Sequence, residues 1–88
     1  MKASIALQVL PLSQGIDRIA VIDQVIAYLQ AQSVTMVVTP FETVLEGDFD
    51  ELMRILKEAL EVAGQGADNV FANVKINENK YRRDFKHR

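Results

Sequence analysis

The residues best suited to chemistry lie together in the segment Thr39-Pro40-Phe41-Glu42-Thr43. The two threonines carry hydroxyl groups, Glu42 carries a carboxylate, and Phe41 offers an aromatic face on which a ligand ring can stack. Such a set is typical of the rim of a small-molecule site. The same spacing fits an ordinary proline-containing hairpin in which threonine hydroxyls bond their own backbone, so both interpretations stay open.

Two groups of carboxylates have structural explanations beside their chemical ones. Glu42 and Glu46 are of the residue type used for general acid and base catalysis, but glutamates that flank a hairpin strand are usually solvated. Asp48 and Glu51 have the three-residue spacing of a helix capping box. Together with Asp50 they look like a metal cluster, but the spacing is not that of a calcium-binding EF-hand loop. We therefore expect no metal site.

Several classes of chemistry are excluded by residues that the chain lacks. It has no cysteine and a single histidine, His87, which excludes disulfides, zinc–thiolate sites and cysteine nucleophiles and argues against a catalytic triad. Gly64 and Gly66 follow a predicted helix, whereas phosphate-binding glycines precede one. The loop 11–15 lacks the arginine that acylphosphatase-type catalysis requires. We therefore expect a protein that is not an enzyme and that carries no resident cofactor.

The composition is that of one globular domain. The chain has 88 residues, of which 49% are hydrophobic and 25% are charged, so we expect a single domain over residues 1–88. No apolar run approaches the roughly 20 residues of a membrane span, and no signal peptide is visible. We therefore expect a cytoplasmic protein with no membrane partner.

The charge is unevenly distributed, although the net charge is only −2. Residues 75–88 contain six basic and two acidic side chains, whereas residues 1–74 contain four basic and ten acidic ones. The acidic body repels phosphates, so we expect no nucleic-acid partner. We interpret the basic tail, residues 78–88, as a solvated helix or as a segment that docks on an acidic neighbouring subunit through Tyr81 and Phe85.

Hydrophobic periodicity predicts six elements before this tail. Alternating or β-branched runs over 3–10, 34–39, 43–46 and 69–77 predict four strands. Apolar residues at spacings of three and four predict two helices, over 17–32 and from 48 to about 63. The stripe of the first helix comprises Ile19, Ile22, Val25 or Ile26, and Leu29. The stripe of the second comprises Phe49, Leu52, Met53, Leu56, Ala59, Leu60 and Ala63.

The ends of both helices also have sequence signals. Ser13 or Asp17 is expected to cap the first helix. The second begins at Asp48, and Gly64 has the position of a C-terminal capping glycine.

The order strand, helix, strand, strand, helix, strand predicts an α+β fold of the ferredoxin-like βαββαβ type. We expect a four-stranded antiparallel sheet with two helices on one face, plus a short C-terminal tail or helix. From the right-handed crossover rule we further expect the first and third strands to lie side by side and parallel.

The sheet face away from the helices is predicted to be half polar and half apolar. This open face carries side chains from the first strand, the last strand and the hairpin. Those of the first and last strands are Ser4, Ala6, Gln8, Leu10, Phe71, Asn73 and Lys75. Such a surface suits packing against a second subunit that traps polar groups. A plain dimer interface without any ligand explains it equally well.

Three stretches together resemble a known family. They are residues 8–12 (QVLPL), residues 39–47 (TPFETVLEG) and residues 67–76 (ADNVFANVKI). In this order and at these distances they are similar to the small thiamine-binding proteins of the MTH1187/YkoF-like superfamily, long called a family of unknown function. The resemblance covers essentially the whole chain. One departure is that the family's hairpin more often carries a small pair such as Met-Gly where this chain has Phe41 and Glu42.

The resemblance implies a non-catalytic protein that binds thiamine or its aminopyrimidine moiety in a pocket at the open face. It also implies self-association through the open sheet faces, to a dimer or tetramer. The matching hairpin motif gives Thr39, Glu42, Thr43 and Glu46 as ligand-binding residues. The assignment of faces adds two amides, Gln8 and Asn73.

Two alternatives remain open at this point. One is a structural or regulatory homo-oligomer that takes no small ligand. The other is an enzyme of thiamine-precursor metabolism that uses Glu42 and Glu46, which the lack of a suitable histidine or cysteine disfavours.

Overall fold

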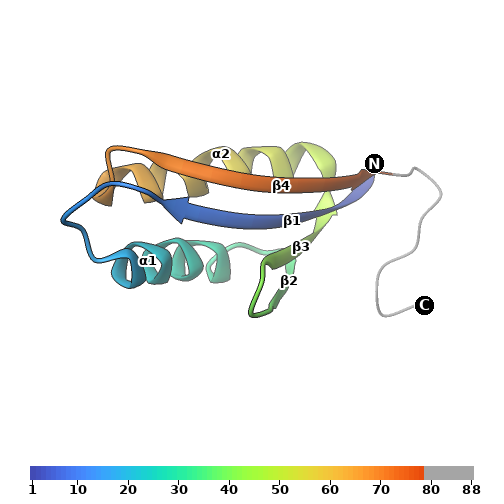
Figure 1. The fold of residues 1–88 in the computed structure, drawn as a ribbon. Coiled ribbons are helices and arrows are strands. Elements are labelled where there is room, and N and C mark those ends of the chain that lie inside the picture. Colours follow the sequence, from blue (N-terminus) through green and yellow to red (C-terminus); the bar gives the residue numbers. More distant parts are fainter. Residues whose placement is uncertain (79–88) are drawn as a thin grey trace.

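The computed structural model describes residues 1–78 and contains the six predicted elements in the predicted order (Figure 1). They are β1 (Lys2–Pro11), α1 (Arg18–Gln30), β2 (Thr35–Val38), β3 (Thr43–Asp48), α2 (Phe49–Gly66) and β4 (Val70–Glu78). One four-stranded sheet has the order β2-β3-β1-β4, and both helices pack on one face, so the ferredoxin-like prediction is confirmed. Within residues 1–78, no helix has the length and apolarity needed to cross a bilayer.

The basic tail was predicted over residues 78–88. Apart from Glu78, which ends β4, this segment lies outside the described residues, as do its predicted contacts Tyr81 and Phe85.

The direction of the first and third strands differs from the prediction. β1 lies beside β3, as expected, but the two strands are antiparallel, and β1 is also antiparallel to β4. The reason is topological. The crossover through α1 connects β1 to β2, so these are the parallel strands, and the hairpin turn then sends β3 back between them.

Strand β1 is paired on both sides for only part of its length. β3 pairs with it over residues 2–7, whereas β4 pairs with it over residues 3–11. Among the described residues, no strand pairs with residues 8–11 on the β3 side. This half-paired end of β1 lies next to the hairpin turn and α1, and it leaves room for a recess there.

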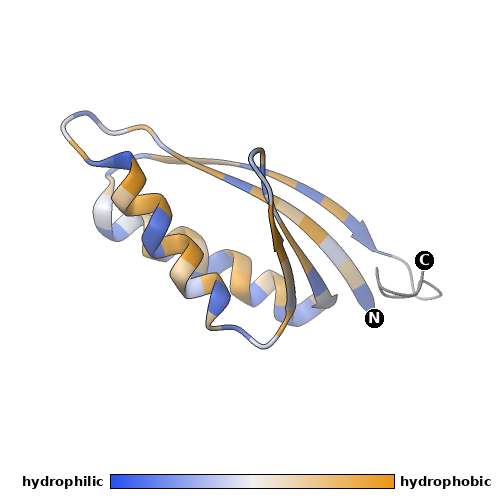
Figure 2. Ribbon diagram, turned by 90° about the horizontal axis from the view of Figure 1, so that it is seen from below, coloured by the Kyte–Doolittle hydropathy of each residue, from blue (hydrophilic) through white to orange (hydrophobic). Residues whose placement is uncertain are grey.

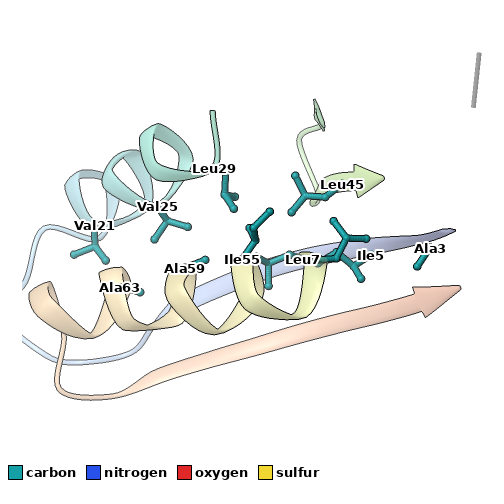
Figure 3. Packing of buried hydrophobic residues seen from close by; sticks show 11 residues of the cluster. Ala3, Ile5, Leu7, Val21, Val25, Leu29, Leu45, Ile55, Ala59 and Ala63 are labelled. Carbon is teal, nitrogen blue, oxygen red and sulfur yellow. The ribbon is translucent and has the colours of Figure 1, made fainter. Parts of the chain in front are cut away.

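The core lies between the sheet and the two helices (Figure 3). Alternation along β1, visible as alternating hydropathy in Figure 2, buries Ala3, Ile5 and Leu7 at 0–3% exposure. The remaining buried members of the cluster are Val21, Val25, Leu29, Leu45, Leu52, Ile55, Ala59 and Ala63.

The apolar stripes predicted for the two helices were partly wrong. In α1 the buried residues follow a spacing of four, from Val21 through Val25 to Leu29. Ile19 is two residues before Val21, about 200° away around the helix, and is therefore 73% exposed. In α2, Ile55 is fully buried although the predicted stripe omitted it, because this helix packs against α1 as well as against the sheet.

The predicted caps are confirmed at one helix end only. The Asp17 carboxylate accepts a hydrogen bond from the Ala20 N–H at 3.1 Å. Asp48 occupies the N-cap position of α2 but makes no side-chain cap bond. Its carboxylate instead accepts a hydrogen bond from the Met1 ammonium at 3.3 Å, which lowers its pKa. At the other end, α2 continues past the predicted capping Gly64 to Gly66.

At Gly66 the two helices approach each other closely. A Cβ atom at this position would lie 2.9 Å from Cγ2 of Val21, a buried residue of α1. A Cβ atom at Gly64, two residues earlier in the same helix, would meet nothing within 4 Å. The two glycines therefore differ in function, and only Gly66 is required by packing.

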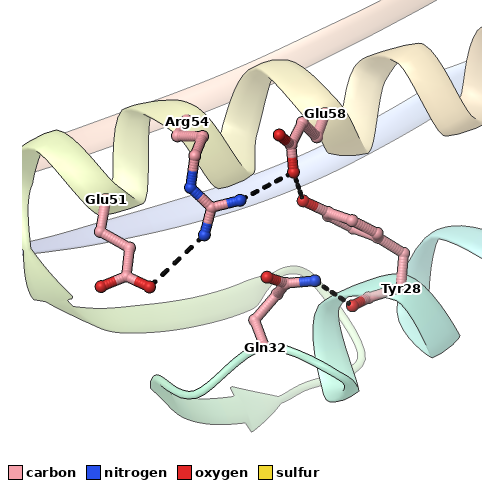
Figure 4. A network of polar contacts seen from close by, with 5 residues as sticks. All are labelled: Tyr28, Gln32, Glu51, Arg54 and Glu58. Carbon is pink, nitrogen blue, oxygen red and sulfur yellow. Dashed lines mark hydrogen bonds and ion pairs between the residues drawn. The ribbon is translucent and has the colours of Figure 1, made fainter.

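A polar network joins the helices on their outer side (Figure 4). The half-buried Tyr28 of α1 donates its hydroxyl hydrogen to Glu58 of α2. Arg54 forms an ion pair with Glu58 at 2.8 Å and a longer one with Glu51 at 3.4 Å. Burial, reinforced by the hydrogen bond to Glu58, raises the pKa of Tyr28 to about 12.

We expect opposite effects from alanine at the two glycines. Gly66→Ala should destabilise the protein by about 1–3 kcal/mol, since the new methyl group overlaps Val21. Gly64→Ala should stabilise it by about 0.5–1 kcal/mol, because alanine favours an exposed helical position. Urea unfolding of both variants measures this. Equal stabilisation by both would contradict the close approach.

We expect the Tyr28 hydroxyl to lose its proton at a higher pH than an ordinary tyrosine does. The absorbance change of wild type minus that of Tyr28→Phe should show a tyrosinate midpoint near pH 12, above the ordinary value of about 10. Because the folded pKa is raised, the associated stability is fully present below about pH 10 and is lost as the pH rises towards 12. A difference titration centred near pH 10 would show that the hydroxyl is solvated.

Candidate functional site

The turn between β2 and β3 is closed by hydrogen bonds of one residue, Thr39. Thr39 Oγ1 donates to the Glu42 carbonyl at 2.7 Å and accepts from the N–H groups of Phe41 and Glu42 at 3.2 and 3.0 Å. The Thr39 N–H also donates to the Glu42 carbonyl, at 3.0 Å. The hairpin interpretation of this segment is therefore confirmed for Thr39. The turn leaves the Phe41 ring 80% exposed.

A polar recess lies on the open face beside this turn, and we call it the polar hollow. Gln8 and Asn73 are cross-strand partners, and the Asn73 Nδ2 donates to the Gln8 Oε1 at 3.1 Å. Lys75 Nζ lies 2.8 Å from Glu42 Oε1. The hollow has a volume of about 460 Å³ and is lined by Ala6, Gln8, Phe41, Glu42, Asn73, Val74 and Lys75. This volume falls within the range of small-molecule sites, about 300–1,000 Å³.

A second recess, the apolar hollow, lies on the helix side at the half-paired end of β1. It has a volume of about 210 Å³ between α1, β1 and the hairpin. Its lining includes Ile22 and Ile26 of α1, Leu10 of β1 and Thr43 of β3. The two hollows share the wall residues Gln8, Phe41 and Glu42.

The structure brings five of the six predicted site residues to the two adjoining hollows, and Glu46 is the exception. Gln8, Glu42 and Asn73 line the polar hollow. Thr39 closes the adjoining turn and lines the apolar hollow.

Thr43 is on the other side of the sheet. It pairs with Leu7 and shares the core-facing side with Leu45, at 8% exposure. Its hydroxyl therefore belongs to the apolar hollow, whereas the side chains on either side of it in sequence face the opposite way.

Glu46 lies apart from both hollows. It is four residues beyond Glu42 along β3, about 13 Å at the rise of an extended strand. It pairs with Ser4, whose Oγ donates to the Glu46 Oε2 at 3.2 Å, and it is 3% exposed. Glu42 and Glu46 therefore do not form the carboxylate pair that acid–base catalysis would need.

Sequence reasoning placed Lys75 on the open face but did not assign it to the site. Its ion pair with Glu42 spans the width of β1. The alternation of β4 gives the face of Lys75, but only the strand register shows that its ammonium reaches the hairpin turn.

The site has no arrangement typical of a metal centre. Within residues 1–78, no three histidine, cysteine, aspartate or glutamate side chains are grouped so that they could hold an ion.

Comparison with known proteins gives the family. The family described as thiamine-binding protein matches residues 5–88. The UPF0045 protein CPE1503 of Clostridium perfringens is 36% identical over 78 residues, which cover 88% of this chain and 82% of that protein.

Solved structures share the fold. Protein SP2199 of Streptococcus pneumoniae has 89% sequence identity and a TM-score of 0.85, over 92% of this chain and 90% of that chain. A domain of unknown function, DUF77, from Bacillus cereus has 28% sequence identity and a TM-score of 0.86, over 92% of this chain and 79% of that chain. With the family match extending over nearly the whole sequence, the chain belongs to the thiamine-binding protein family.

Proposed function

We propose that this protein binds thiamine or its aminopyrimidine moiety, without catalysis, at the polar hollow and the apolar hollow beside it. The observation that carries the proposal is the convergence of two amides and a carboxylate, those of Gln8, Asn73 and Glu42, below an exposed aromatic ring. Membership of a family named for binding, not for a reaction, supports the ligand class and the absence of turnover.

The chemistry of the polar hollow is complementary to an aminopyrimidine. Such a ring donates hydrogen bonds from its exocyclic amine and accepts them at its ring nitrogens. Glu42 is an acceptor, and the amides of Gln8 and Asn73 can each donate and accept. The exposed Phe41 ring can stack on the pyrimidine or lie against the thiazolium cation.

The other predicted residues have different parts in this proposal. Thr39 holds the turn at the rim of the two hollows in place, because its hydroxyl is hydrogen-bonded to the backbone of Glu42. Thr43 offers a hydroxyl to a group that enters the apolar hollow. Glu46 extends the site only if the ligand reaches along the open face to Ser4.

A second copy of the chain would enclose the polar hollow, and we include this in the proposal. The open face and its rim expose Val37, Phe41 and Phe71 at 47%, 80% and 51%. These exposed side chains also favour the second candidate function, a homo-oligomer without a small ligand.

Ligand-dependent stability is the direct test. A ligand that binds only the native state stabilises it by RT ln(1 + [L]/Kd), about 2.7 kcal/mol at a hundredfold excess. Millimolar thiamine or the free aminopyrimidine alcohol should therefore raise the unfolding midpoint by several degrees. The absence of a shift with both would reject the binding function and leave the ligand-free oligomer.

Glu42→Gln should weaken thiamine binding by about 1–3 kcal/mol, because the variant keeps the shape of the side chain but loses its charge. Isothermal titration measures the change. Glu61→Gln is the matched control, since Glu61 is an exposed residue of α2. Equal affinity of the Glu42 variant and the control would place the ligand elsewhere.

Thr43→Ala and Glu46→Gln test how far the site extends. A ligand that contacts these buried groups should bind about 1–3 kcal/mol more weakly in the variant concerned. Unchanged affinity in both would confine the ligand to the polar hollow.

A further inference from the structure

The side chain of Lys75 crosses the polar hollow. Lys75 of β4 pairs with Ala6 of β1, and Ala6 pairs with Val44 of β3. Lys75 and β3 are therefore two strand spacings apart, about 10 Å. The lysine nevertheless reaches Glu42 at 2.8 Å. The alanine between them has only a methyl group, which leaves the space that the extended stem needs.

The two partners of this ion pair are unequally buried. The Lys75 side chain is 76% exposed, whereas the Glu42 side chain is 22% exposed. The carboxylate therefore depends more on a positive partner than the ammonium does on a negative one. Holding the long lysine stem in one conformation also opposes the pairing, so such exposed pairs are weak.

We infer that Lys75 is a specificity-determining residue that competes with the ligand for Glu42. This inference rests on the proposed function. In the unliganded protein the lysine ammonium occupies the position of a cation beside the carboxylate. A ligand that carries its own positive charge replaces it, and the released lysine returns to water. An uncharged ligand can bind with the Lys75–Glu42 ion pair left in place, so Lys75 lowers the affinity for a cation more than it lowers the affinity for an uncharged ligand.

The consequence is that removing the lysine charge should improve binding of a cation. Lys75→Met keeps an unbranched stem over Ala6 but has no charge to compete. We expect the Kd of thiamine to fall about threefold to tenfold in this variant. The Kd of the uncharged aminopyrimidine alcohol should change less. Lys57→Met on α2, which removes the same charge from an exposed position outside the site, should leave both unchanged.

Isothermal titration of wild type and these two variants with both ligands tests the inference. Thiamine affinity that is equal or weaker in Lys75→Met would overturn it, as would an equal gain for the two ligands. If thiamine binds wild type but Lys75→Met shows no gain, only this inference fails. If neither ligand binds any of the three proteins, the proposed function fails as well.

Two further readouts separate competition from a general effect of the substitution. Adding Glu42→Gln to Lys75→Met should abolish the gain, because the carboxylate for which the two cations compete is gone. The Kd of Lys75→Met should also rise more steeply with sodium chloride than that of wild type. In wild type the cationic ligand replaces the Lys75 ammonium beside Glu42, so the number of ion pairs does not change. In the variant the ligand forms a new ion pair with Glu42, and salt screens this attraction. Equal salt dependence would contradict the exchange.

Discussion

The unequal pairing of β1 determines where this small fold can form a recess. β1 is central in the sheet and longer than its partner β3, so its last residues are paired only with β4. Residues Ala3, Ile5 and Leu7 of its first part are buried in the core cluster. The last residues have an open flank between α1 and the hairpin turn. The same strand therefore stabilises the fold at one end and forms the floor of the candidate site at the other.

Alternation along the strands divides the hairpin between two environments. Thr43 faces the core side and Glu42 faces the open side, although they are neighbours in sequence. The wall between the apolar and polar hollows is consequently thin and consists of Gln8, Phe41 and Glu42.

The sequence predicts the order and type of the elements well, because strong hydrophobic periodicity and capping signals are local. It predicts Ser13 or Asp17 as the cap of α1, and Asp17 is the residue that caps it. It also predicts the inward residues of β1 correctly. The prediction fails where contacts between residues that are distant in the sequence determine the structure. The direction of β3 follows from the crossover, and the exposure of Ile19 follows from the rotation of α1.

The same limit applies to the site. Residue types and faces are sufficient to group Gln8 with Asn73, since both point outward from neighbouring strands. The separation of Glu46 from Glu42 follows from simple strand geometry. The pairing of Lys75 with Glu42 cannot be derived locally, because it depends on the register of two strand pairs and on the small size of Ala6.

The way in which Thr39 closes the hairpin turn has a consequence for how binding preference can diversify. Within residues 1–78, its hydroxyl bonds backbone atoms of Phe41 and Glu42 and no side chain, so the closure of the turn does not depend on the side chains at those two positions. The backbone loop can therefore stay constant while its two presented side chains are exchanged. A smaller pair of side chains at positions 41 and 42 would keep the same backbone loop and widen the opening of the polar hollow.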